Sequence, residues 1–339
     1  MKKVLIIRLS ALGDVIFTIP LANALKKAGY SVDWLVSEKG YELLQGNSCV
    51  DNVILAPVEK WKKTKKCCQN FKEYLNIIKT LRKNKYDISI DSQMLFKSFV
   101  WHVFCGAKRR IIARNNREFA FLGATEIIPS IVGERHVSQD YLQFAKHLGV
   151  DISNVEVTLP ELEQSVKDKV DDLLSNVEKS KQLVVICPAT TWDTKHWNKD
   201  NWKAVIEDLE KDYTLVFTGQ QRDNELISYI GGDRHLNLAG KTNLKELREV
   251  FNRADLVISL DSGSTHLAWA TQTPKILSIF CSTPTVKYGP LGDKYISLSG
   301  PNLKCQPCHK KKCPLLSNAC TYLPSVEDVV NSARKLLSK

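Results

Sequence analysis

The chain has 339 residues, of which 43% are hydrophobic and 25% charged, with a net charge of +11 at pH 7. This length suits two domains, and the composition is that of a globular protein rather than a disordered one. No stretch approaches the about 20 consecutive apolar residues of a membrane-spanning helix, and charged residues interrupt the N-terminal apolar run where a signal peptide would continue, so we expect a cytoplasmic protein.

The first half of the chain alternates segments typical of strands and of helices. Apolar runs predict strands at residues 4–9, 31–37, 52–57 and 86–93. Apolar residues at helical spacing predict helices at residues 19–29 and 71–85. This alternation favours a parallel sheet with helices on both faces.

The second half repeats the alternation. Strands are predicted at residues 182–190, 213–220, 255–263 and 274–280, and helices at residues 198–211, 222–231, 244–254, 264–272 and 324–338. A polar segment without strands separates the halves, and we place the domain boundary near residues 160–180. We therefore predict an α/β protein of two similar domains facing across a cleft, with ligands at the carboxyl ends of the strands.

Positive charge is concentrated in one region. Between Pro57 and Glu118, sixteen lysines and arginines stand against five acidic residues, so the rest of the chain is close to neutral. Such a region favours a polyanionic partner, which is nucleic acid, an anionic membrane surface or a phosphorylated substrate. For residues 60–66 a solvated lysine-rich face is an equally good interpretation. The region lacks a known nucleic-acid-binding module and interleaved aromatic residues, so nucleic-acid binding is the alternative rather than the expectation.

The segment LSALGDVIFTIP, residues 9–20, follows the first predicted strand. Gly13 allows the backbone to approach a ligand closely, and Asp14 lies at the start of the next helix. Aspartate is a favoured N-cap, but the carboxyl end of a strand is also where an α/β domain places its active groups. Spacing alone leaves the cap and the catalyst equally open for Asp14. Arg8 and Ser10 are adjacent polar candidates.

A loop of the second half, residues 188–202, has the composition of a phosphate site. Thr190 and Thr191 supply hydroxyl and backbone N–H groups, and Lys195 supplies a positive charge. The simpler interpretation is an ordinary loop whose tryptophans cover the core.

A second anion site is predicted within residues 258–270, where a strand ends at Asp261 and a helix follows directly. The backbone N–H groups of residues 262–265 and the helix dipole favour an anion there. His266 lies on the first helical turn. The chain has neither a Walker loop nor a Rossmann glycine motif.

Four cysteines cluster near the C-terminal end, with the spacing C-x2-C-x4-C-x6-C: Cys305, Cys308, Cys313 and Cys320. Four thiolates can bind a structural zinc ion. The usual zinc site has two close pairs separated by a longer loop, so we favour free thiols or a disulfide over zinc.

Five segments together resemble glycosyltransferase family 9, the bacterial heptosyltransferases. They are LSALGDVIFTIP (9–20), NKYDISIDSQMLFKS (84–98), ERHVSQDYLQFAKHLGV (134–150), ATTWDTKHWNKDNW (189–202) and SLDSGSTHLAWA (259–270). They occur in the family's order and spacing, and ATTWDTKHW is similar to the type I members in particular. The four-cysteine segment is more similar to the endings of type II or unassigned family members.

The resemblance implies the GT-B fold, which has two Rossmann-like domains. Residues 1–170 would form the acceptor-binding domain and residues 171–324 the domain that binds the nucleotide-sugar donor. A terminal helix at residues 325–339 would pack back on the N-terminal domain.

The resemblance also implies an activity. Family members transfer L-glycero-D-manno-heptose from ADP-heptose with inversion and need no metal or other cofactor for the chemistry. The type I acceptor is a Kdo residue of Kdo-lipid A, in the inner core of lipopolysaccharide. We therefore expect a monomer on the cytoplasmic face of the inner membrane. A type II heptosyltransferase, or a family 9 enzyme with another sugar or acceptor, is the alternative.

Site residues follow from the family's motifs. Asp14 matches the general base, and Lys195 matches the lysine that neutralises the donor pyrophosphate. The donor-binding residues implied are Thr190, Thr191, Lys195, Asp223, Glu225, Asp261, Ser262, Gly263 and His266, with Asp223 and Glu225 as alternatives for the acid that holds the ribose. The acceptor-binding residues implied are Ser10, Gly13, Lys60, Lys62, Lys63, Lys97 and Arg117.

Overall fold

The computed structural model describes residues 1–64, 67–131, 133, 135–301 and 303–338. The chain divides into two compact units, unit 1 (Met1–Glu161) and unit 2 (Leu162–Lys339). The boundary therefore lies after residue 161, which is inside the predicted range of residues 160–180. The reason is the polar helix α7 (Gln164–Leu173), which belongs to unit 2 because Lys169 pairs with Glu246 of that unit at 2.6 Å.

Unit 1 is built on a single parallel sheet in the order β3-β2-β1-β4-β5-β6. Its strands are β1 (Lys3–Ile7), β2 (Ser31–Val36), β3 (Asn52–Leu55), β4 (Ile88–Asp91), β5 (Arg109–Ala113) and β6 (Glu126–Ile128). Its helices are α1 (Leu12–Lys27), α2 (Glu38–Leu44), α3 (Val58–Lys63), α4 (Cys67–Lys83), α5 (Phe96–Phe104), η1 (Ala120–Gly123) and α6 (Val137–His147).

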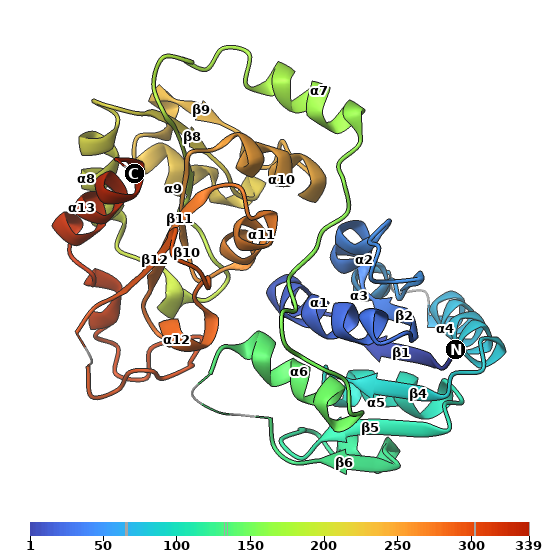
Figure 1. Ribbon diagram of the computed structural model, residues 1–339. Coiled ribbons are helices and arrows are strands. Elements are labelled where there is room, and N and C mark those ends of the chain that lie inside the picture. The colour runs from blue at the N-terminus through green and yellow to red at the C-terminus, as the bar shows by residue number, and fades with distance from the viewer. Residues whose placement is uncertain (65–66, 132, 134, 302, 339) are drawn as a thin grey trace. The chain divides into compact units, whose positions relative to one another are not determined.

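Helices cover both faces of this sheet (Figure 1). Side chains of a strand alternate between faces, and Leu5 and Ile7 of β1 pack with Leu81 of α4 and Trp101 of α5. The opposite face is covered by α1 and α6, which lie side by side. Since β1 is buried on both faces, its sequence KVLII is an almost continuous apolar run.

Unit 2 contains a second parallel sheet, in the order β12-β11-β10-β7-β8-β9. Its strands are β7 (Leu183–Cys187), β8 (Thr214–Phe217), β9 (Leu236–Asn237), β10 (Leu256–Leu260), β11 (Lys275–Phe280) and β12 (Tyr295–Ser299). Its other helices are η2 (Asp193–Lys195), α8 (Lys199–Leu209), η3 (Gln221–Asp223), α9 (Asn224–Tyr229), η4 (Gly232–Arg234), α10 (Leu244–Arg253), α11 (Gly263–Thr271), α12 (Thr285–Tyr288), η5 (Ala319–Tyr322) and α13 (Val326–Leu337).

The terminal helix α13 begins at its predicted N-cap, Ser325, whose hydroxyl accepts the Asp328 N–H at 3.1 Å. Its apolar side chains, among them Val329 and Leu336, are buried in the core of unit 2 together with α8 and the central strands. That this helix also packs back on the N-terminal domain stays a prediction. Its one apolar face is already used within its own unit.

Numbered from the first strand of each unit, both sheets have the strand order 3-2-1-4-5-6, which is the Rossmann order. The predicted α/β fold of two Rossmann-like domains is thereby confirmed. None of the described helices combines the length and the apolar character needed to cross a membrane.

Candidate active site

Each sheet has a point where the chain reverses its direction of travel across the sheet, and ligands of open α/β sheets bind beside that point. In unit 1 it lies between β1 and β4, and in unit 2 between β7 and β10. The segments that follow these four strands contain Asp14, Ser92, Lys195 and Asp261. Most of the predicted site residues thus fall at two equivalent positions, one in each unit.

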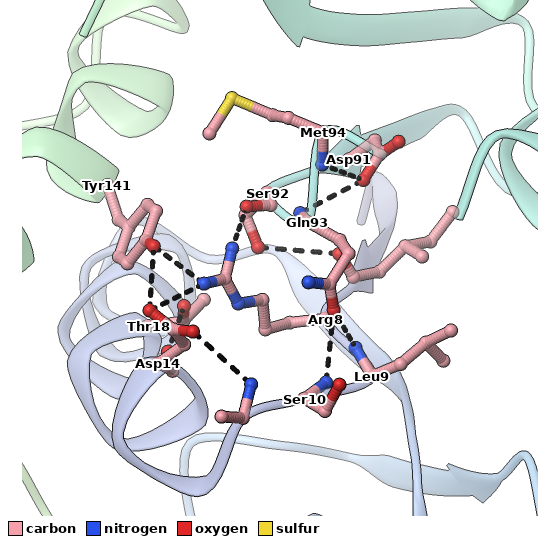
Figure 2. Close-up of polar contacts among 12 residues, drawn as sticks. Arg8, Leu9, Ser10, Asp14, Thr18, Asp91, Ser92, Gln93, Met94 and Tyr141 are labelled. Atoms are coloured by element: carbon pink, nitrogen blue, oxygen red, sulfur yellow. Dashed lines mark hydrogen bonds and ion pairs between the residues drawn. The ribbon is translucent and has the colours of Figure 1, made fainter. Parts of the chain in front are cut away.

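In unit 1 the site is built around the buried side chain of Arg8, at the end of β1 (Figure 2). Its Nη2 lies 2.7 Å from Oδ1 of Asp14 and donates to the Tyr141 hydroxyl at 2.7 Å, while Nη1 donates to the carbonyl of Ser92. Tyr141 belongs to α6, and its hydroxyl donates to the same Oδ1 of Asp14 at 3.3 Å. Burial opposes the charge on Arg8, but Asp14, together with Tyr141 and Asp91, outweighs it and raises the pKa of the guanidinium.

Asp14 is not the N-cap residue of α1, but its side chain takes part in capping that helix. The N-cap of α1 is Ala11, whose N–H donates to Oδ2 of Asp14 at 3.2 Å. The other carboxylate oxygen faces Arg8 and Tyr141, and the side chain is 34% exposed. One oxygen therefore closes the first turn of the helix, while the other is oriented by Arg8 and Tyr141, and the catalytic role of Asp14 stays a prediction.

The turn after β4 supports the same site. Buried Asp91 accepts the N–H groups of Gln93 and Met94 at 3.0 and 2.9 Å and the Ser98 hydroxyl at 2.8 Å. Burial raises the pKa of Asp91 to about 6 despite these donors. Gln93, held in place by this turn, accepts the N–H groups of Leu9 and Ser10 through Oε1, each at 3.0 Å. These hydrogen bonds thus connect the carboxyl ends of β1 and β4.

Of the basic residues predicted to bind the acceptor, one contacts the site in unit 1 and another is paired with an acid elsewhere. Lys97 of α5 joins the site, because its Nζ donates to the Ser10 hydroxyl at 2.8 Å. Burial, followed by the charges of Lys62 and Arg8, lowers the pKa of Lys97. Lys60 is paired with Glu73 at 2.7 Å.

The remaining predicted acceptor residues have different surroundings. Lys62, Lys63 and Arg117 are exposed, and Arg117 is fixed through its backbone N–H to the carbonyl of Met94 at 3.0 Å. Gly13 is buried within the first turn of α1.

In unit 2 the site is centred on Asp261, whose side chain is 2% exposed at the end of β10. Lys195 lies 2.6 Å from its Oδ2, Thr283 donates to the same oxygen at 2.5 Å, and Nε2 of His266 lies 3.5 Å from Oδ1. Burial opposes the charge of Asp261, but His266 and Lys195 outweigh it, and the pKa of the carboxyl is far below its usual value. Lys195 also lies over the ring of Trp192, at 4.6 Å from the centroid.

The other residues predicted to bind the nucleotide-sugar donor include Thr190 and Thr191, on the loop at residues 188–202, and Ser262 and Gly263, at the start of α11. The Thr190 hydroxyl donates to the backbone carbonyl of Asp261 at 3.3 Å, and Thr191 is exposed next to it. Ser262 is the N-cap of α11, and Gly263 is its first residue. Within the described part of the chain, the buried Ser262 hydroxyl has no hydrogen-bond partner. An unpartnered donor at a helix N-terminus suits an anionic ligand.

The two acids proposed for the ribose differ in environment. Asp223 follows β8 closely, and its Oδ2 accepts the Gln220 N–H at 2.7 Å. Glu225 is exposed on the first turn of α9. The geometry leaves both as alternatives.

The four cysteines lie in the segment 301–324, in which Cys305 is exposed and Cys320 is buried in the core of unit 2. Among the residues that the structure describes, no three His, Cys, Asp or Glu side chains are arranged to hold a metal ion. The segment is hydrogen-bonded to the loop at residues 188–202. The Thr321 carbonyl accepts the Asn198 N–H at 2.7 Å, and the Lys310 carbonyl accepts the Thr194 hydroxyl.

Sequence reasoning missed three residues of these sites: Gln93, Tyr141 and Thr283. Gln93 and Tyr141 lie inside segments 84–98 and 134–150, which carry part of the family resemblance, so a closer study of those segments could have found them. Thr283 follows a strand with no distinguishing pattern, and its contact with Asp261 arises only when β10 and β11 pair.

Comparison with known proteins gives consistent results. The model of glycosyltransferase family 9 (heptosyltransferase) matches residues 74–318. Lipopolysaccharide heptosyltransferase 1 of Pseudomonas aeruginosa is 28% identical over 338 residues, with 96% of this chain and 89% of that protein covered. The same enzyme of Escherichia coli K12 is 26% identical, with 81% and 86% covered.

Solved structures are similar over nearly the whole chain. A family 9 glycosyltransferase of Veillonella parvula gives a TM-score of 0.83 at 20% identity, with 99% of this chain and 97% of that chain covered. The heptosyltransferase WaaC of E. coli with ADP gives 0.76 at 21% identity, with 98% and 99% covered. At these identities the likeness concerns the fold.

Proposed function

The chain belongs to glycosyltransferase family 9, the heptosyltransferase family, and is therefore a glycosyltransferase; from this premise we propose that it transfers heptose from ADP-heptose to a Kdo residue of Kdo-lipid A in lipopolysaccharide core synthesis. Two features support the donor and the type I acceptor. The curated relatives at 28% and 26% identity are named lipopolysaccharide heptosyltransferase 1, and the segment ATTWDTKHW resembles type I members.

The donor is proposed to bind to unit 2. The observation that carries this proposal is the cluster of Lys195, Asp261 and His266 beside the N-terminus of α11. Lys195 would neutralise the pyrophosphate as ADP departs, because a fixed cation stabilises charge that develops on a leaving group. The unpartnered Ser262 hydroxyl and the first N–H groups of α11 would hold phosphate oxygens. Asp261 would accept hydroxyl groups of the heptose.

The acceptor is proposed to bind to unit 1, with Asp14 as general base. Its carboxylate would take the proton of the acceptor hydroxyl as that oxygen attacks the anomeric carbon, which inverts the configuration there. Arg8 and Tyr141 fix the orientation of the carboxylate, and its partial exposure leaves it accessible to a substrate. Lys97, fixed on the Ser10 hydroxyl, would meet an anionic group of the acceptor.

Further features of the enzyme belong to the same proposal. The transfer step would use the charge of Lys195 in place of a metal ion. The protein would act as a monomer at the cytoplasmic face of the inner membrane, where a lipid-linked acceptor is exposed. The basic Pro57–Glu118 region would then meet anionic groups of lipid and acceptor.

The test is ADP release from ADP-heptose, measured with and without Kdo-lipid A. The wild type, Asp14→Ala and the control Asp151→Ala are compared, since Asp151 is an exposed carboxylate of the same unit. We expect acceptor-dependent release that Asp14→Ala loses and Asp151→Ala retains, with ADP-heptose binding unchanged in both. Near wild-type turnover of Asp14→Ala would contradict the base assignment.

The same assay separates the alternative acceptor. The four-cysteine segment resembles the endings of type II heptosyltransferases, whose acceptor already contains a heptose. Release that requires a heptosylated acceptor would favour type II over type I. Absence of ADP-heptose binding would contradict both.

A further inference from the structure

Unit 1 exposes an unusual group of large apolar side chains on and around α5 and η1. Phe119 and Leu122 are 73% and 68% exposed, and Phe96, Phe104 and Phe121 are exposed as well. Single exposed apolar residues are common, but soluble proteins seldom gather several on one surface without a partner. We call these five residues the aromatic patch.

The members of the patch are held together by the fold. The Phe96 N–H donates to the Glu118 carboxylate at 3.0 Å, which fixes the start of α5 beside the loop that leads into Phe119. The rings of Phe119 and Phe121 lie 6.4 Å apart. At Gly123 an added Cβ would lie 2.6 Å from Val103, so η1 packs closely on α5. These contacts hold Phe96, Phe119 and Phe121 on two neighbouring elements, α5 and η1.

Cations lie close to the patch along the chain. Lys97, Arg114 and Arg117 are exposed on α5 and on the loop that precedes Phe119. They form the end of the Pro57–Glu118 region, which holds the excess positive charge of the chain. Exposed aromatic and leucine side chains with lysine and arginine on the same segments suit the headgroup layer of an anionic membrane, because the rings enter the apolar boundary while the cations meet lipid phosphates.

We propose that the aromatic patch is the surface by which unit 1 docks on an anionic phospholipid bilayer. This inference deepens the proposed function, since an acceptor anchored in lipid must be met at the membrane. The same helix links the two surfaces, because Phe96 belongs to the patch while its neighbour Lys97 donates to Ser10 of the candidate acceptor site. Docking through the patch brings that site to the lipid surface.

The test is flotation of the full-length protein with lipid vesicles, which needs neither donor nor acceptor. Vesicles of phosphatidylethanolamine with phosphatidylglycerol are compared with vesicles of phosphatidylcholine alone. The test variant is Phe119→Ser/Leu122→Ser, and both replaced side chains are already mostly in water. The matched control is Val286→Ser/Leu316→Ser in unit 2, where the exposed fractions are 64% and 87%.

We expect the wild type and the control to float with the anionic vesicles. The partition coefficient of the Phe119→Ser/Leu122→Ser variant onto these vesicles should be lower by about tenfold or more, because two inserted apolar side chains are lost. Arg114→Gln should weaken binding about fivefold, as expected for one cation near an anionic surface, and salt should weaken it further.

Three results would overturn the proposal. They are a wild type that does not bind anionic vesicles, a patch variant that binds as well as the control, and a wild-type dimer in solution that the patch substitutions dissociate. ADP release measured in detergent separates this proposal from the proposed function. The patch variant should keep that release. Absence of ADP release by the wild type would refute the proposed transferase activity but leave the flotation result valid.

Discussion

The substitution Lys195→Met tests how strongly the buried carboxylate of Asp261 depends on its cation. Lys195 lies 2.6 Å from Asp261, whose side chain is 2% exposed. Removal of one partner of a buried ion pair costs roughly 3–5 kcal/mol, because the other charge stays buried without compensation. Thr283 and His266 still face the carboxylate in the variant, so we expect the lower end of that range, about 3 kcal/mol.

The measurement is urea unfolding of the full-length chain, followed by tryptophan fluorescence. The second variant, Lys195→Met/Asp261→Asn, leaves no buried charge and should regain most of the lost stability, which a double-mutant cycle quantifies. The reasoning is refuted if Lys195→Met costs less than about 1 kcal/mol, as an exposed pair would, or if the double variant is no more stable than the single one.

The pH dependence gives an independent check on the same pair. The pKa of Asp261 is lowered in the folded protein. Its contribution to stability is therefore present above the pKa of an unfolded aspartate, about 4, and is lost as the pH falls below it. The difference in stability between wild type and Lys195→Met should narrow in acid. A difference that stays constant down to about pH 3 would contradict this account.

Three further predictions concern unit 1. Burial raises the pKa of Asp91 to about 6, so the folded protein holds a proton that the unfolded chain releases above about pH 4, and stability should fall as the pH rises through that window; thermal unfolding should show a smaller slope for Asp91→Asn. Tyr141→Phe removes a hydroxyl that orients Asp14 and should lower kcat about tenfold with the KM for ADP-heptose unchanged, whereas an unchanged kcat would remove Tyr141 from the site. Gly123→Ala places a Cβ 2.6 Å from Val103 and should destabilise the protein by about 1–3 kcal/mol in urea; an unaffected midpoint would show that η1 yields easily.

The sequence predicted the centre of each sheet better than its edges. The strands β1, β7 and β10 are buried on both faces, so each is a nearly continuous apolar run that stands out from its surroundings. The strand β4, with the sequence ISID, is also buried but alternates apolar and polar residues. The edge strands β6 and β9 have three and two residues, too few for a pattern. The strand β5 begins with two arginines, so its sequence did not stand out as a strand within the basic region.

The candidate site was predictable where chemistry follows a strand directly. Asp14, Lys195 and Asp261 all lie just beyond strands of the sheet centre, so their position was apparent from the order of elements. Tyr141 reaches Asp14 from a helix 127 residues away in sequence, and no local pattern reports such a contact. The cap and catalyst interpretations of Asp14 could not be separated because the two oxygens of one carboxylate serve different partners.

The strand order shared by the two sheets has a consequence for how such enzymes diversify. In each unit the candidate chemical groups follow the first and fourth strands of the sheet. If the proposed function holds, insertions or substitutions in the loops after the other strands, such as the segment after β8 that contains Asp223, would change the preferred substrate of one unit without disturbing the groups proposed to react. Evolution, or an engineer exchanging loops, would then alter donor and acceptor preference separately within one inherited scaffold.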